Sequence, residues 1–156
     1  MAVAIALIIS AVLIAMDQIT KHLAAAYLLP SESVKLIPYI INLTYVENTG
    51  AAFGIFKGGR WPFIVMTIIV ITAIIVIYLK LPKSGYHNCL RAALILITSG
   101  AVGNFIDRIR NGYVVDFIET AFMDFPVFNV ADSCLVIGTI FLGVLVVFEK
   151  RLKRDG

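Results

Sequence analysis

The sequence predicts an all-α integral membrane protein with four transmembrane helices, a small extracytoplasmic β-sheet and an interfacial loop. Of the 156 residues, 60% are hydrophobic and 15% are charged, against roughly half and about a quarter in soluble domains. The mean hydropathy of +0.96 is typical of lipid-embedded chains. So few polar residues could not cover a water-exposed surface. Residues 1–156 are therefore expected to form a single membrane-embedded domain.

Long apolar segments are expected to cross the bilayer at approximately residues 1–28, 61–79, 89–107 and 132–149. The first could instead be a cleaved signal peptide. No Lys or Arg precedes its apolar core, however, and a basic region is expected there in secretory signals. We therefore expect it to be a retained span. The second span carries no charge and is about long enough to cross a bilayer.

Basic residues indicate the orientation of the spans. The connection 80–91 carries three basic residues and no acidic one, and the tail 150–154 carries four basic residues. Short loops rich in Lys and Arg stay in the cytoplasm, so both termini are expected there. Because these charges stand at the ends of apolar runs, they indicate contact with membrane lipids. We expect no nucleic-acid partner.

The third and fourth spans are short between their charged residues. Their uncharged parts contain fifteen and sixteen residues, which as helices reach about 22–24 Å against a hydrocarbon core of ~30 Å. Lys and Arg can extend to the interface, but Asp cannot reach far. Asp107 and Asp132 are therefore expected near the outer interface, and Asp17 falls in the outer half of the first span.

Two of the acids have surroundings that favour a catalytic role. Asp116 lies between apolar residues in VVDFI (114–118), which indicates an extended segment packed against the bundle. Asp132 could be a helix N-cap, but Asn129 could supply that cap instead. Two carboxylates in a poorly hydrated site share one proton. One can then deprotonate water while the other binds the scissile carbonyl, so Asp116 and Asp132 are the catalytic candidates for amide hydrolysis.

Other polar residues near the same interface have structural explanations. Asp17 and Lys21 are four residues apart and could pair along one helix. Asp107 is expected to form an interfacial salt bridge. Arg108 could bind a lipid phosphate or a substrate carbonyl.

The connections outside the membrane differ in character. Residues 34–57 are rich in β-branched and aromatic residues and predict a short sheet. Asn48 and Gly50 in this connection form either a turn or part of a backbone-lined substrate groove. The connection 119–128 contains Phe122, Phe125 and Phe128, which are typical of an interfacial loop.

Two other functions use similar residues. A transporter also contains intramembrane acids, but it would need polar residues at the middle of several spans. A serine peptidase using Ser133 and Lys21 would leave Asp116 without a role. A zinc site is not expected, because His22 and His87 fall on opposite sides of the predicted membrane. Hydrolysis by two carboxylates needs no metal or cofactor.

Five motifs occur in a fixed order along the chain. Together, and over nearly its full length, they resemble the lipoprotein signal peptidase family, also called signal peptidase II. The motifs are DQITK (17–21), NTGAAFG (48–54), GAVGNFIDR (100–108), VVDF (114–117) and FNVADS (128–133). Any one alone would be a weak indication, but five in order across four spans are specific.

This resemblance implies an aspartyl endopeptidase of the bacterial plasma membrane. Its substrates would be prolipoproteins whose lipobox cysteine carries a diacylglyceryl group, cleaved on the amino side of that cysteine. The family's catalytic pair falls on Asp116 and Asp132. The implied partners are lipid-modified prolipoprotein and membrane lipids, with globomycin-like cyclic peptides as inhibitors.

The same resemblance assigns further roles near the outer face. The substrate-contacting Asn and Arg of the family fall on Asn104 and Arg108. Asn48, Gly50 and Asn129 complete the expected substrate-binding set. Supporting roles are expected for Asp17, Lys21, Asp107 and Ala131. A single chain contains every part of this mechanism, so a monomer is expected.

Overall fold

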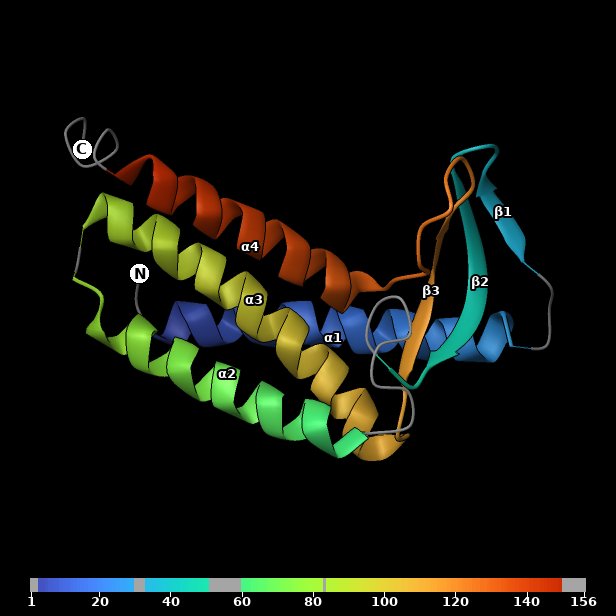
Figure 1. The fold of residues 1–156 in the computed structure, drawn as a ribbon, viewed down its shortest axis with the longest axis horizontal. Helices are drawn as coiled ribbons and strands as arrows, with labels where there is room; N and C mark the ends of the chain where they lie inside the picture. Colours follow the sequence, from blue (N-terminus) through green and yellow to red (C-terminus); the bar gives the residue numbers. More distant parts are fainter. Residues whose placement is uncertain (1–2, 30–32, 51–59, 83, 150–156) are drawn as a thin grey trace.

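The computed structural model describes residues 3–29, 33–50, 60–82 and 84–149. Its helices are α1 (Val3–Tyr27), α2 (Arg60–Lys80), α3 (Gly85–Arg110) and α4 (Val130–Val147), and its strands are β1 (Val34–Ile37), β2 (Ile41–Asn48) and β3 (Val114–Thr120). All four helices are long and apolar enough to cross a membrane. They lie side by side, and the sheet lies beyond one end of the bundle (Figure 1). The predicted fold class is confirmed.

Helix α3 is the central helix of the bundle and packs against α1, α2 and α4. Small residues permit this close packing. A Cβ atom at Gly100 would overlap the carbonyl oxygen of Ala131, and one at Gly103 would lie 2.6 Å from Asp17 Oδ2. Helix α2 has a different environment, since Ile64 is its buried residue and many of its large apolar side chains are exposed.

Polar contacts tie the helices together at the end of the bundle that lies away from the sheet. Arg91 at the start of α3 donates from Nη1 to the carbonyl of Pro82 at 3.1 Å, and its guanidinium lies 5.5 Å from the Tyr78 ring centroid. The Tyr86 hydroxyl donates to the carbonyl of Leu145 in α4 at 3.2 Å. Ser84 caps α3, so the helix begins before the predicted span 89–107.

The three strands form an antiparallel sheet in the order β1-β2-β3. β1 and β2 belong to the connection where a sheet was predicted, although residues 51–59 of that connection lie outside the described part of the chain. The third strand comes from the other connection, at the segment expected only to be extended. The chain enters β3 through Gly112, whose φ of 86° is a conformation that glycine adopts readily.

The buried side of the sheet packs against the last turns of α1. Val115 and Phe117 of β3 form an apolar cluster with Ala24 and Leu28. These contacts fix β3 across the end of the bundle. Asp116, between the two apolar residues, is consequently held at the boundary between the sheet and the helices.

Candidate active site

A cavity of about 500 Å³ lies where the sheet meets α3 and α4. Most of its wall is apolar, and its polar groups converge from different elements, which is typical of a binding site. The residues that line it are Asn48, Gly50, Asn104, Arg108, Val114, Asp116, Phe125, Pro126, Val127, Phe128, Asp132, Ser133, Leu135, Val136 and Ile137. Both catalytic candidates therefore face one cavity, together with four of the five expected substrate-binding residues.

Asp116 is 1% exposed and belongs to the buried part of β3. Its carboxylate accepts hydrogen bonds from Asn48 Nδ2 at 2.9 Å and from Asn129 Nδ2 at 2.6 Å. Burial raises the pKa of Asp116 to about 6, and the negative charge of Asp132 acts in the same direction. The hydrogen bonds from the two amides lower this pKa and only partly offset the effect of burial.

Asp132 takes part both in the cavity and in the start of α4. Asn129 is the N-cap, and its Oδ1 accepts from the Asp132 N–H at 2.8 Å. Asp132 Oδ2 accepts from the Asn129 N–H at 3.3 Å, which completes a capping box. The other carboxylate oxygen, Oδ1, accepts from Asn104 Nδ2 at 2.7 Å. The cap therefore holds the Asp132 side chain in position against the cavity.

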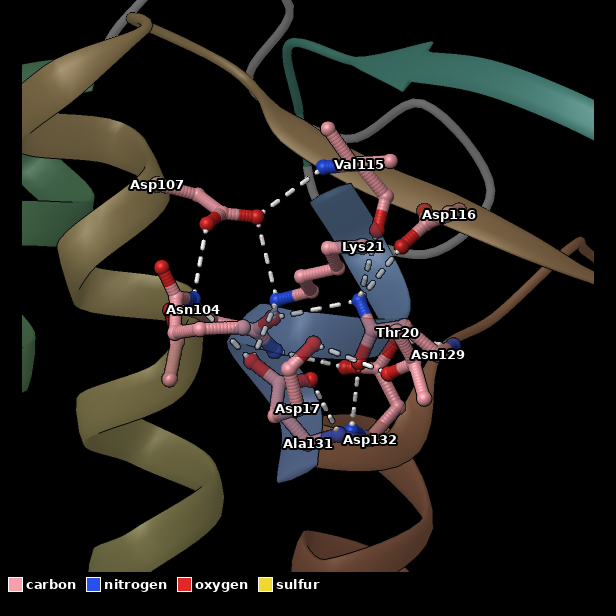
Figure 2. A network of polar contacts seen from close by, with 12 residues as sticks. Asp17, Thr20, Lys21, Asn104, Asp107, Val115, Asp116, Asn129, Ala131 and Asp132 are labelled. Atoms are coloured by element: carbon pink, nitrogen blue, oxygen red, sulfur yellow. Dashed lines mark hydrogen bonds and ion pairs between the residues drawn. The ribbon is translucent and has the colours of Figure 1, made fainter. Parts of the chain in front are cut away.

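Asn129 connects the two carboxylates, although it does not line the cavity. It is 0% exposed. Its side-chain nitrogen contacts Asp116 while its oxygen and backbone N–H contact Asp132. Figure 2 shows Asn129 with contacts to both acids. Asn129 thus fixes the strand that carries one acid relative to the helix that carries the other.

A buried ion cluster lies behind the two acids (Figure 2). Lys21 Nζ is 2.9 Å from Asp17 Oδ2 and 3.0 Å from Asp107 Oδ2. The expected pairing of Asp17 with Lys21 is present, and the salt-bridge partner of Asp107 is Lys21 on α1. Asp17 Oδ1 also accepts from the Ala131 N–H at 2.9 Å. The cluster joins α1, α3 and the first turn of α4.

Gln18 belongs to the same cluster, although its role was not predicted from the sequence. Its Nε2 atom donates to Asp107 Oδ1 at 3.0 Å and to the carbonyl of Gly103 at 3.2 Å. These partners lie more than eighty residues away along the chain, so no local pattern identifies them. The presence of Gln18 in DQITK was the one available indication.

Arg108 reaches the cavity from the last turns of α3. Its Nη2 atom donates to the carbonyl of Gly50 at 3.3 Å and its Nη1 atom to the carbonyl of Asn104 at 3.4 Å. The guanidinium carbon lies 4.8 Å from the centroid of the Phe63 ring, within cation–π distance. Arg108 therefore presents a positive charge at the cavity edge beside the turn that follows β2.

The apolar wall consists of residues 125–128 and of one face of α4 that includes Leu135 and Val136. The sequence predicted the aromatic residues at an interface but did not place them against the acids. Ser133 also lines the cavity, but its hydroxyl donates to the carbonyl of Asn129 at 3.1 Å. With Lys21 held by Asp17 and Asp107, a serine–lysine arrangement receives no support.

The geometry suits hydrolysis of a peptide bond. Two carboxylates face one cavity, each held by a carboxamide group, and the burial of Asp116 favours retention of a proton. An ionised carboxylate can deprotonate water while a protonated one binds the carbonyl oxygen under attack. The wall of the cavity is mostly apolar, and the four helices are long and apolar enough to cross a membrane.

Known proteins are similar to this chain over most of its length. Residues 9–148 match the family described as Signal peptidase (SPase) II. The lipoprotein signal peptidase of Caldanaerobacter subterraneus subsp. tengcongensis is 48% identical over 92% of this chain and 97% of its own, and that of Enterococcus faecalis is 39% identical over 96% and 91%. A bacterial membrane enzyme solved by the in meso method at 2.3 Å superposes with a TM-score of 0.83 at 35% identity, covering 98% of this chain and 92% of its own.

Proposed function

The chain belongs to the signal peptidase II family, and on that premise we propose that Asp116 and Asp132 activate the water molecule that cleaves its substrate. As a member, the chain is a multi-pass bacterial membrane peptidase that removes signal peptides from prolipoproteins. The observation that carries the proposal is that both carboxylates, Asp116 buried and Asp132 half-buried, line one cavity, with Asn129 hydrogen-bonded to each.

The bond cut is the peptide bond on the amino side of the diacylglyceryl-modified cysteine. Asp132, ionised, takes a proton from water as the water oxygen attacks the scissile carbonyl carbon. Asp116, protonated, donates a hydrogen bond to the carbonyl oxygen and stabilises the negative charge that develops there. The tetrahedral intermediate then collapses, and the proton held by Asp132 passes to the leaving amine. The raised pKa of Asp116 supports its assignment as the proton holder.

Other residues of the cavity bind and orient the substrate. Asn48 and Asn104 each hold one catalytic carboxylate. Arg108, beside the carbonyl of Gly50, offers donors to a substrate carbonyl. The apolar wall formed with α4 accepts the hydrophobic part of the substrate next to the membrane.

The proposed orientation places both termini in the cytoplasm and the cavity near the outer face of the plasma membrane. The basic connection between α2 and α3 supports it. A diacylated substrate remains in the bilayer, and a site at interface depth meets both this substrate and water. One chain supplies the whole cavity, so we propose a monomer, inhibited by globomycin-like cyclic peptides that occupy the cavity.

The test is cleavage of a purified diacylglyceryl-prolipoprotein, with the products identified by mass. Asp116→Asn and Asp132→Asn should each abolish cleavage while the protein still accumulates in the membrane. Ser133→Ala, which changes a neighbouring cavity residue, should remain active. Activity in either Asn variant would refute the assignment, and an inactive Ser133→Ala variant would then indicate a serine nucleophile. Ion flux in sealed vesicles without a peptide product would indicate a transporter.

A further inference from the structure

We propose that Lys21 is a positioning residue whose ammonium group fixes the orientation of the Asn104 carboxamide, so that the amino end of this amide faces Asp132. This inference rests on the proposed function, because it concerns the surroundings of the proposed general base. Lys21 touches neither the cavity nor the reacting atoms, and it acts through Asn104.

Lys21 can only donate hydrogen bonds, and three acceptors surround it. The side chain is 4% exposed. Its Nζ atom lies 2.9 Å from Asp17 Oδ2, 3.0 Å from Asp107 Oδ2 and 2.9 Å from Asn104 Oδ1. An ammonium group carries three N–H donors, and each has one acceptor here. The atom of Asn104 that faces Lys21 must therefore be the oxygen.

The orientation of the Asn104 carboxamide determines which of its atoms contacts Asp132. With Oδ1 directed at Lys21, the Nδ2 atom of Asn104 lies 2.7 Å from Asp132 Oδ1 and donates to it. The opposite orientation would place an amide oxygen against a carboxylate oxygen and an amino group against an ammonium group. Both contacts would be repulsive in a buried site. A donor on the carboxylate stabilises its ionised form, which is the form that accepts a proton from water.

The orientation of Asn104 also affects the hydrogen bonds of Asp116. Asn104 Oδ1 also accepts from Asn129 Nδ2 at 3.1 Å, so the amino end of Asn129 is drawn to this side. That amino group donates to Asp116 Oδ1 at 2.6 Å. The helix cap favours the same orientation of the Asn129 carboxamide, since Asn129 Oδ1 accepts from the Asp132 N–H. Lys21 thus lies at the start of a chain of amide groups that gives each acid a donor.

Lys21 also neutralises buried negative charge, and the test must separate this role from the orientation of the amide. The double variant Lys21→Met/Asp17→Asn removes one positive and one negative charge, so the net charge of the cluster is unchanged. The matched control is Asp17→Asn alone, in which Lys21 still faces Asn104. A second control is Thr20→Val, whose hydroxyl donates only to the α1 carbonyls of Met16 and Asp17 among the described contacts.

The measurements are thermal unfolding in detergent and the kcat and KM for a diacylglyceryl-prolipoprotein. We expect the double variant to accumulate and to have a kcat about tenfold to a hundredfold below that of the unsubstituted protein, whose cluster has the same net charge, and below that of Asp17→Asn, which retains Lys21. The KM should be similar in all three. Thr20→Val should match the unsubstituted protein. A kcat of the double variant equal to that of the unsubstituted protein or to that of Asp17→Asn would overturn the proposal.

If the double variant does not accumulate, Asn104→Asp decides the question. A carboxylate at this position can still accept from Lys21, but it offers Asp132 no donor. We expect a folded protein with kcat lowered about a hundredfold, and full activity would overturn the proposal. Asp132→Asn, measured in parallel, distinguishes failure of the inference about Lys21 from failure of the proposed function. If Asp132→Asn is active, the proposed function is refuted. If only the inference about Lys21 is wrong, Asp132→Asn remains inactive.

Discussion

At the scale of single residues, carboxamide side chains control the two acids. Asn48 and Asn129 donate to Asp116, and Asn104 donates to Asp132. A carboxamide is neutral, so it can favour the ionised form of a carboxylate without adding a charge to a buried site. Lys21 supplies a positive charge to this network through its hydrogen bond to Asn104. The protonation of each acid can therefore depend on the charge of the other.

The contact from Asn48 predicts a change in pH dependence. Its hydrogen bond lowers the pKa of Asp116, so Asn48→Ala should raise that pKa above its present value of about 6. In the proposed mechanism activity requires the proton on Asp116, and loss of this proton produces the basic limb of the kcat/KM profile. This limb should move to higher pH by about 1–2 units, the scale of one hydrogen bond to a charged group.

The matched control for this substitution is Asn42→Ala in the same strand, because Asn42 donates to Glu119 at 3.1 Å, outside the cavity. Its basic limb should coincide with that of the unsubstituted protein. A limb that stays in place or moves to lower pH in Asn48→Ala would contradict the role given to this contact.

At the scale of elements, the close packing of α3 against α4 positions Asp132. Gly100 lies against the carbonyl of Ala131, one residue before Asp132, and has no room for a Cβ atom. The cap at Asn129 and the contact of Ala131 with Asp17 fix the same turn of α4. Any displacement of this turn moves the carboxylate relative to Asp116.

Gly100→Ala should therefore damage both stability and activity. Overpacking of this kind costs about 1–3 kcal/mol, and the shifted turn should lower kcat. Thermal unfolding and cleavage assays measure the two effects. Gly143→Ala is the control, since nothing lies within 4 Å of a Cβ atom there. This control should be as stable as the unsubstituted protein or slightly more so, and equal behaviour of the two variants would contradict the packing argument.

The spans could be predicted, and Asp116 and Asp132 could be selected as candidates, because their signals are local. Apolar runs identify the helices, and Asp116 stands out because Val and Phe flank it. Contacts between distant segments could not be predicted. The pairing of β3 with β2 joins residues such as Asp116 and Val46, and the partners of Gln18 lie on another helix. Such contacts depend on how helices pack, and no spacing in one segment encodes that.

At the scale of the whole molecule, the two ends of the helix bundle differ in structure. The sheet lies at one end (Figure 1), and the cavity is lined by residues of β2, β3 and the neighbouring ends of α3 and α4. The start of α1, the connection between α2 and α3, and the end of α4 lie at the other. In the proposed orientation the first end meets the substrate at the outer face and the second carries the basic residues of the cytoplasmic side.

Thiol labelling can test this orientation. Cys89 near the start of α3 is exposed and serves as the reporter for the proposed cytoplasmic end. Tyr39, in the turn between β1 and β2, is 89% exposed. In intact spheroplasts a membrane-impermeant reagent should label Tyr39→Cys in a Cys89→Ala background and should not label Cys89 of the unsubstituted protein. In permeabilised spheroplasts the reagent should label both cysteines. The reverse pattern in intact spheroplasts would show that the topology is the opposite of the proposed one.

The most direct test of the proposed dyad is the titration of Asp116 by NMR, with the protein labelled with ¹³C at the aspartate carboxyl carbons. Comparison with Asp116→Asn identifies its resonance. We predict that the pKa of Asp116 is about 6, and that Asp132→Asn lowers this pKa, because a neighbouring negative charge is removed. An Asp116 that titrates near the ordinary value of about 4, and does not respond to Asp132→Asn, would contradict the account.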